Sequence, residues 1–125
     1  MKTCIASLLA AAVLAGCGGG LYLEFSDDDP PSVSLASGSS SAAPGQAVRL
    51  AAAASDDDYV TEVVFYRVEA NGSTTFLGAD GGEPYEWNAL IPSGAVRGST
   101  VLFFARAYDS VGQSRDSASV AVTVL

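Results

Sequence analysis

Aspartate side chains are the residues in this sequence whose type and spacing could bind a ligand. Asp56, Asp57 and Asp58 form an uninterrupted run, and Asp109 ends a second apolar stretch later in the chain. Clustered carboxylates suit a hard cation such as Ca²⁺, which takes about six to eight oxygen ligands in flexible geometry. We therefore predict these four aspartates as a candidate metal site for Ca²⁺, and we expect no other cofactor.

A simpler interpretation of the same residues stays open beside this one. Asp56 and Asp109 each follow a strand-like run, where an aspartate caps a turn by accepting backbone N–H hydrogen bonds. The run from Asp56 to Asp58 is then a solvated loop. The spacing also lacks the Asp-x-Asp-x-Asp-Gly order of a calcium-binding loop of the EF-hand type.

Composition argues against catalysis and against nucleic-acid binding. The chain has no histidine, its one lysine is Lys2, and fourteen Asp and Glu outnumber six Lys and Arg. Histidine is the commonest general base and lysine the usual amine nucleophile. An acidic surface repels nucleic-acid phosphates. We therefore expect a protein that is not an enzyme, has no catalytic residue and has no nucleic-acid partner.

The first sixteen residues have the three-part pattern of a secretory signal. Lys2 provides the positive start, an apolar run extends from Ile5 to Leu14 with only Ser7 as a polar interruption, and small residues precede Cys17. The run is shorter than the roughly twenty apolar residues of a spanning helix. We predict a cleaved signal peptide over residues 1–16, a flexible acidic tether over 17–30 and one domain over 31–125.

The residues Leu14-Ala15-Gly16-Cys17 resemble the lipobox of bacterial lipoproteins. The resemblance implies that the Cys17 thiol takes a diacylglyceryl group, that the signal is cut before it, and that the new amino terminus is acylated with a chain such as palmitate. The membrane is then a partner through this N-terminal lipid. Gly18 resembles the sorting residue of outer-membrane lipoproteins, so we expect a protein of the bacterial cell envelope, held at the outer membrane.

Beyond residue 31, short β-rich runs alternate with clusters of Gly, Ser, Asn, Asp and Pro, and no stretch of ten residues has a helical period. The number of runs predicts an all-β, seven-stranded immunoglobulin-like sandwich. Asn71-Gly72 predicts a two-residue type I′ hairpin turn. The seven predicted strands are 32–36, 47–54, 60–69, 74–77, 85–90, 100–109 and 117–124.

Two of these strands carry the same alternating pattern. The stretches from Val48 to Asp56 and from Val101 to Asp109 both place a large apolar residue third, alanines fifth and seventh, and aspartate ninth. Alternate residues of a strand share one face. The pattern therefore predicts that Leu50 and Phe103 face the core between two sheets, with Phe104 on the opposite face.

With these strands in order, the chain resembles the bacterial Ig-like domains found along secreted and surface proteins. The resemblance implies a spacer, adhesion or accessory module with no shared catalytic residues. It also implies that the four candidate aspartates lie at the end of the sandwich that the tether enters. The segments that carry it are 31–35, 45–56, 63–66, 76–78, 84–87 and 105–112.

Aromatic residues give the last candidate site. Trp87, Tyr85, Tyr59 and Tyr66 could stack on sugar rings, but a buried Trp is a regular part of such sandwiches, and we expect Trp87 to pack at the core. The function that the sequence supports is a lipid-anchored envelope protein with a binding, adhesion or spacer role. The alternative is a carbohydrate- or Ca²⁺-binding accessory module, with a protein or glycan of the envelope as partner.

Overall fold

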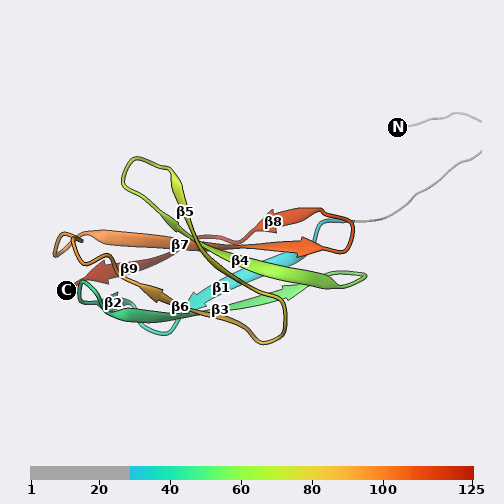
Figure 1. Ribbon diagram of the computed structural model, residues 1–125, viewed down its shortest axis with the longest axis horizontal. Helices are drawn as coiled ribbons and strands as arrows, with labels where there is room; N and C mark the ends of the chain where they lie inside the picture. Colours follow the sequence, from blue (N-terminus) through green and yellow to red (C-terminus); the bar gives the residue numbers. More distant parts are fainter. Residues whose placement is uncertain (1–28) are drawn as a thin grey trace, which may run out of the picture.

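The computed structural model describes residues 29–125, which form nine β-strands (Figure 1). The predicted signal peptide, Cys17 and the predicted tether up to residue 28 lie outside the described residues. Within residues 29–125, no helix is long and apolar enough to cross a membrane. The strands are β1 (Ser32–Ser37), β2 (Ser41–Ala42), β3 (Ala47–Ser55), β4 (Val60–Val68), β5 (Thr74–Asp80), β6 (Tyr85–Leu90), β7 (Thr100–Asp109), β8 (Ser114–Asp116) and β9 (Val120–Val124).

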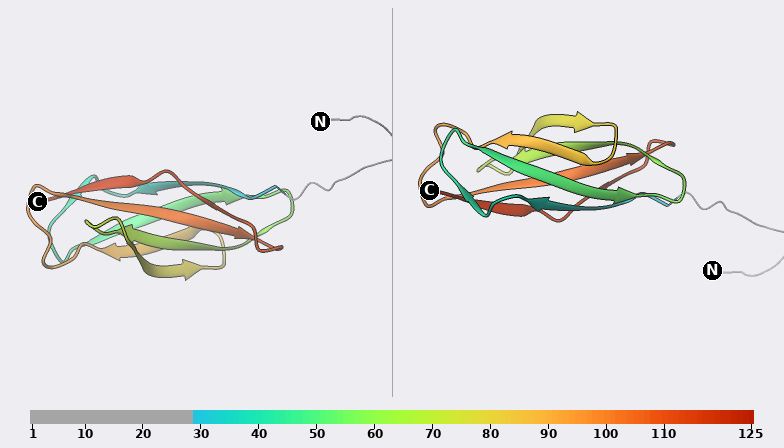
Figure 2. Two further views of the ribbon diagram at one scale, coloured as in Figure 1. Left: turned by 90° about the horizontal axis from the view of Figure 1, so that it is seen from above. Right: turned by 90° about the horizontal axis from the view of Figure 1, so that it is seen from below.

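The strands form two sheets that face each other as the layers of a sandwich (Figure 2). One sheet has the order β1-β3-β6. The other has the order β2-β9-β7-β4-β5, with β8 also paired to β7. The pair β2–β9 is parallel and the other pairs are antiparallel. The predicted all-β sandwich is confirmed, but the predicted count of seven strands is wrong for the described residues.

β9 covers only Val120–Val124 of the predicted strand 117–124, and β8 (Ser114–Asp116) is an extra strand before it. Ser117 separates the two. Its N–H donates to the Ala105 carbonyl at 2.8 Å, and its own hydroxyl accepts from the Ala105 N–H at 3.0 Å. The hydroxyl thus replaces the backbone carbonyl that a regular ladder would supply, and the strand breaks there. β8 pairs with one part of β7 and β9 with another. The second extra strand, β2, is only two residues long and carries no pattern that a sequence could show.

The core lies between the sheets and follows the alternating pattern of β3 and β7. Leu50 and Phe103 are each 0% exposed. Val48 and Val101 lie in the same buried cluster, together with Phe65 from β4. The prediction that Leu50 and Phe103 face the core is confirmed.

The outer face of the larger sheet carries an aromatic cluster of its own. Phe104 points away from the core, as its position in the pattern predicts, yet it is only 9% exposed. Its ring stacks on Tyr66 with centroids 5.0 Å apart, and the Arg106 guanidinium lies 5.1 Å from the Tyr66 ring centre. Tyr66 from the neighbouring strand β4 and Arg106 from β7 itself thus cover Phe104 where solvent would be expected.

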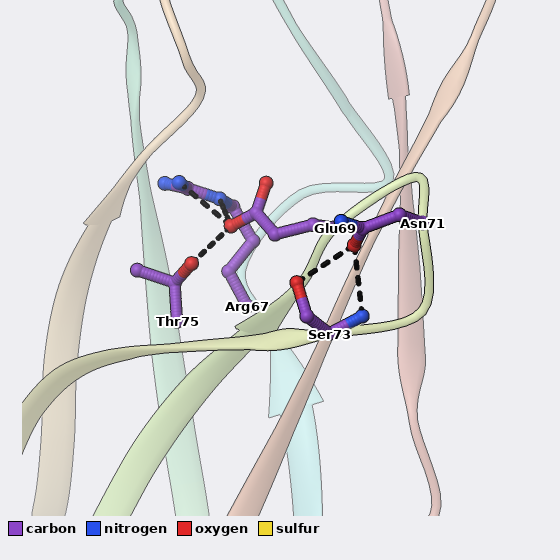
Figure 3. Close-up of polar contacts among 5 residues, drawn as sticks. All are labelled: Arg67, Glu69, Asn71, Ser73 and Thr75. Carbon is purple, nitrogen blue, oxygen red and sulfur yellow. Dashed lines mark hydrogen bonds and ion pairs between the residues drawn. The ribbon is translucent and has the colours of Figure 1, made fainter.

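The hairpin between β4 and β5 is one residue longer than the predicted two-residue turn (Figure 3). The Gly72 N–H donates to the Glu69 carbonyl at 2.9 Å, and the Glu69 N–H donates to the Ser73 carbonyl at 2.7 Å. Gly72 has φ of 88°. These bonds define a three-residue loop that closes with a left-handed glycine. The Asn71 side chain accepts from the Ser73 N–H at 3.0 Å and stabilises that loop.

Polar side chains tie the two strands together beside this hairpin (Figure 3). The Glu69 carboxylate accepts from the Arg67 guanidinium at 2.9 Å and from the Thr75 hydroxyl. The Thr75 hydrogen bond and then the Arg67 contacts hold the pKa of Glu69 below its usual value. The ionised form of Glu69 is therefore favoured by folding.

The chain enters and leaves the sandwich at opposite ends of its long axis (Figure 1). Residue 29 lies at the end that carries the β3–β4 loop and the β7–β8 turn. Leu125 lies at the other end, where its N–H donates to the Ala42 carbonyl at 2.9 Å. The strands run along the line between these two points.

Candidate functional site

The predicted aspartates lie at the end of the sandwich where residue 29 enters. Asp109 ends β7, is 4% exposed, and accepts hydrogen bonds from the N–H groups of Val111 at 3.0 Å and Gln113 at 2.8 Å. Asp58 accepts from the Ser110 hydroxyl at 3.0 Å, which links the β3–β4 loop to the β7–β8 turn. Asp109 therefore caps its turn, as the simpler interpretation predicts.

Asp56 and Asp57, in the β3–β4 loop, are more exposed to solvent than Asp109. The pKa of Asp56 is raised by desolvation and by the negative charges of Asp57 and Asp109, although the Asp58 N–H opposes this through a 3.4 Å contact. Asp29 lines the same hollow as Asp56 and Asp57. In residues 29–125, no three acidic side chains are arranged to hold a metal ion. The calcium site stays a prediction from sequence.

The four aromatic candidates do not come together as one platform. Tyr59 is 60% exposed in the β3–β4 loop, Tyr85 is buried, and Tyr66 lies on the outer face of the other sheet. Trp87 packs against the core and stacks on Phe65 with ring centroids 6.4 Å apart. The prediction that Trp87 packs at the core is confirmed.

Trp87 owes its position to a glycine on the other sheet. A Cβ built on Gly78 of β5 would lie 2.2 Å from a carbon of the indole ring, closer than two carbon atoms can approach. The ring therefore lies directly on the backbone of β5. This contact connects the edge strands of the two sheets, β5 and β6.

A hollow of about 430 Å³ opens beside Trp87 at this edge, and sequence reasoning missed it. Its volume falls in the range of about 300 to 1,000 Å³ that ligand pockets occupy. Arg49 and Glu86 form an ion pair at 2.5 Å, and Asp80 accepts from the Glu86 N–H at 3.0 Å. The lining residues are Arg49, Asp80, Pro84, Glu86, Trp87 and Asn88.

No local pattern in the sequence could have placed Arg49 in this hollow. Arg49, on β3, lies far from Trp87 in the chain, whereas the other five lining residues fall within residues 80–88. The register of β3 with β6 pairs Arg49 with Asn88 and Leu50 with Trp87, and this pairing brings Arg49 beside Trp87. The larger sheet then adds Asp80 from the opposite layer.

These features define an all-β sandwich domain of the immunoglobulin and fibronectin type. A family of known domains described as "Bacterial Ig domain" matches residues 31–102. The chain belongs to this bacterial Ig domain family. Domains of this class are consistent with a binding or spacer role and place the chain among bacterial extracellular or envelope proteins.

A solved structure supports the same fold. The chain is similar to the fibronectin(III)-like modules of Clostridium thermocellum CbhA, with 26% sequence identity and a TM-score of 0.59. The match covers 76% of this chain and 46% of the solved chain, so this chain spans less than half the length of the chain it matches. No curated protein sequence matches the chain.

Proposed function

We propose that the chain is a lipoprotein of the bacterial outer membrane whose Ig-like domain acts as a spacer and binding module, without catalysis. The lipid on Cys17 holds it to the membrane, and the segment up to residue 30 connects that lipid to the sandwich. The partner of the module is a protein or a glycan of the envelope.

The path of the chain through the domain carries this proposal. Residue 29 lies at one end of the sandwich and Leu125 at the other (Figure 1), so the domain extends away from its tether by the length of its strands. Two acids at the tether end engage backbone N–H groups and a hydroxyl, in the manner of structural caps. Both observations favour a structural and binding role.

Anchoring is tested by replacing the cysteine that would carry the lipid. Cys17→Ser removes the thiol, so we expect it to abolish incorporation of labelled palmitate and to release the protein from the membrane fraction. More than one acyl chain is needed to hold a protein stably on a membrane, at about 0.8 kcal/mol per buried CH₂.

Cys4→Ser is the matched control, because Cys4 lies inside the predicted signal peptide and leaves with it. This variant should be lipidated and retained like the wild type. Membrane retention and palmitate labelling of the Cys17→Ser variant would contradict the proposal.

A further inference from the structure

We propose that the hollow at the β5–β6 edge is a binding site for a neutral carbohydrate. This site rests on the binding role proposed above and names the class of ligand for it, but it does not depend on how the chain is anchored. The Trp87 and Pro84 side chains form the apolar part of its lining, and four polar side chains form the rest. Pockets that bind small molecules combine apolar and aromatic walls with a few placed polar groups in this way.

Trp87 supplies a wall that does not have to move when a ligand arrives. Its indole stacks on Phe65 and rests on the backbone of Gly78, and both of these residues belong to the larger sheet. A side chain that is already fixed loses little conformational entropy on binding. The C–H faces of a pyranose ring are apolar and pack well against such an aromatic surface.

The polar groups around Trp87 suit hydroxyl groups in particular. Arg49 and Asn88 offer N–H donors, while Asp80 and Glu86 offer carboxylate acceptors. Neighbouring sugar hydroxyls both donate and accept hydrogen bonds, so they can use both kinds of group. The Arg49–Glu86 ion pair and the hydrogen bonds of Asp80 to the N–H groups of Gly82 and Glu86 hold these side chains in place.

Charge selects among carbohydrates. Two carboxylates and one guanidinium line the hollow, which leaves it with an excess of negative charge. The chain as a whole carries a formal net charge of −8. An anionic sugar would be repelled by the hollow itself and by the net negative charge of the chain. The ligand is therefore a neutral oligosaccharide.

The same geometry disfavours an extended peptide on β6. A strand that added to this edge would need the outward N–H of Glu86 for its ladder of hydrogen bonds. Asp80 already accepts that N–H at 3.0 Å, and its carboxylate occupies the position of an added strand. Carboxylates and other charged groups at sheet edges oppose strand addition.

The test uses the fact that Trp87 is the one tryptophan of the whole sequence. The full chain, purified in a mild detergent, is titrated with cellohexaose or with N-acetylchitohexaose while tryptophan fluorescence is recorded. We expect a saturable change for at least one of these neutral oligosaccharides and none for hexagalacturonate, which is anionic. Because the chain has no other tryptophan, a change in tryptophan emission reports on the surroundings of Trp87.

Variants then locate the site. Arg49→Ala and Asn88→Ala, both on the exposed rim, should each weaken binding about tenfold, since each removes donors to the ligand. Phe76 is an exposed aromatic residue of β5 that does not line the hollow, so Phe76→Ala should leave binding unchanged. Circular-dichroism melts of each variant show that it is folded.

Three results would overturn the carbohydrate site. The first is no saturable change with either neutral oligosaccharide at millimolar concentration. The second is tighter binding of hexagalacturonate, and the third is binding that Arg49→Ala and Asn88→Ala leave intact. None of these results bears on membrane retention, so the site and the anchor fail or succeed separately.

Discussion

At the centre of the sandwich, Leu50 and Phe103 fill the space between β3 and β7, and both are fully buried. Removing either side chain leaves a cavity that close-packed neighbours cannot refill. We expect Phe103→Ala to cost about 3 to 5 kcal/mol and Leu50→Ala about 2 to 5 kcal/mol in the free energy of unfolding. Such losses are comparable to the whole stability of a domain of this size. Urea denaturation measures both.

Phe76→Ala is the matched control for Phe103→Ala, because Phe76 is 61% exposed. It should change the unfolding free energy by less than about 1 kcal/mol. Losses below about 1 kcal/mol for both core variants would show that the register of the strands is displaced by one residue.

Gly78 is a second residue whose side chain, here a single hydrogen, decides packing across the two sheets. Gly78→Ala places a methyl group inside the indole ring of Trp87. We expect the variant to lose about 1 to 3 kcal/mol of stability through overpacking and to shift the tryptophan emission to longer wavelength as the ring is displaced into solvent. Denaturation followed by fluorescence measures both effects in one experiment.

Gly82→Ala tests whether this effect is specific to the contact. Gly82 has open space around the position of a Cβ, and its φ is outside the left-handed region. The variant should behave like the wild type. Equal losses from both alanine variants would contradict the contact between Gly78 and Trp87.

At the scale of elements, two hairpins of the sandwich share one design. In both, a glycine with positive φ closes a three-residue loop: Gly72 between β4 and β5, and Gly112 between β7 and β8. In the first loop the Asn71 side chain accepts from the Ser73 N–H, and in the second the Asp109 side chain accepts from the N–H groups of Val111 and Gln113. The dipeptide Asn71-Gly72 marked the first hairpin correctly, but it could not tell a two-residue from a three-residue loop.

The first of these hairpins makes stability depend on pH through Glu69. Its folded pKa lies below the usual value of about 4.5, so the ionised form stabilises the folded state at neutral pH. That contribution is lost as pH falls from the unfolded pKa through the folded one. We expect wild-type stability to fall more between neutral and acid pH than that of Glu69→Gln, in urea melts at both pH values.

Thr75→Val refines this prediction. The Thr75 hydroxyl is the first cause of the lowered pKa, so its removal should raise the Glu69 pKa toward the usual value and weaken the pH dependence. If the wild type and Glu69→Gln lose equal stability in acid, Glu69 does not contribute to the pH dependence of stability, which would contradict this prediction.

Strands with long alternating patterns could be predicted from sequence, and those without one could not. β3 and β7 alternate apolar residues over nine or more positions, which fixes both their type and the face they bury. The break at Ser117 depends on one hydroxyl that meets a backbone N–H of another strand. The position of Arg49 in the hollow beside Trp87 depends on the register of β3 with β6. Both features depend on tertiary contacts, which a local sequence pattern does not reveal.

At the scale of the whole molecule, acidic side chains gather at the end where residue 29 lies, and this is where the calcium prediction is tested. A ligand that binds only the folded state stabilises it by RT ln(1 + [L]/Kd). The calcium prediction therefore expects millimolar Ca²⁺ to raise the melting temperature of the full chain. A chain with Asp56→Asn, Asp57→Asn and Asp58→Asn should lose that rise.

The turn-cap interpretation expects the opposite result. Asp109 already has its hydrogen-bond partners in the backbone of the β7–β8 turn. With caps and solvated loops alone, Ca²⁺ leaves the melting temperature unchanged, and the triple variant melts like the wild type. That outcome would remove the calcium site.

The placement of the two chain ends also determines how the domain responds to tension. A pull between residue 29 and Leu125 runs parallel to the strands, while the hydrogen bonds of the sheets lie across them. Such a pull slides β1 along β3 and β2 along β9, so that the hydrogen bonds of each pair share the force at once instead of opening one after another. The sandwich therefore resists a pull between these two points as one stiff unit.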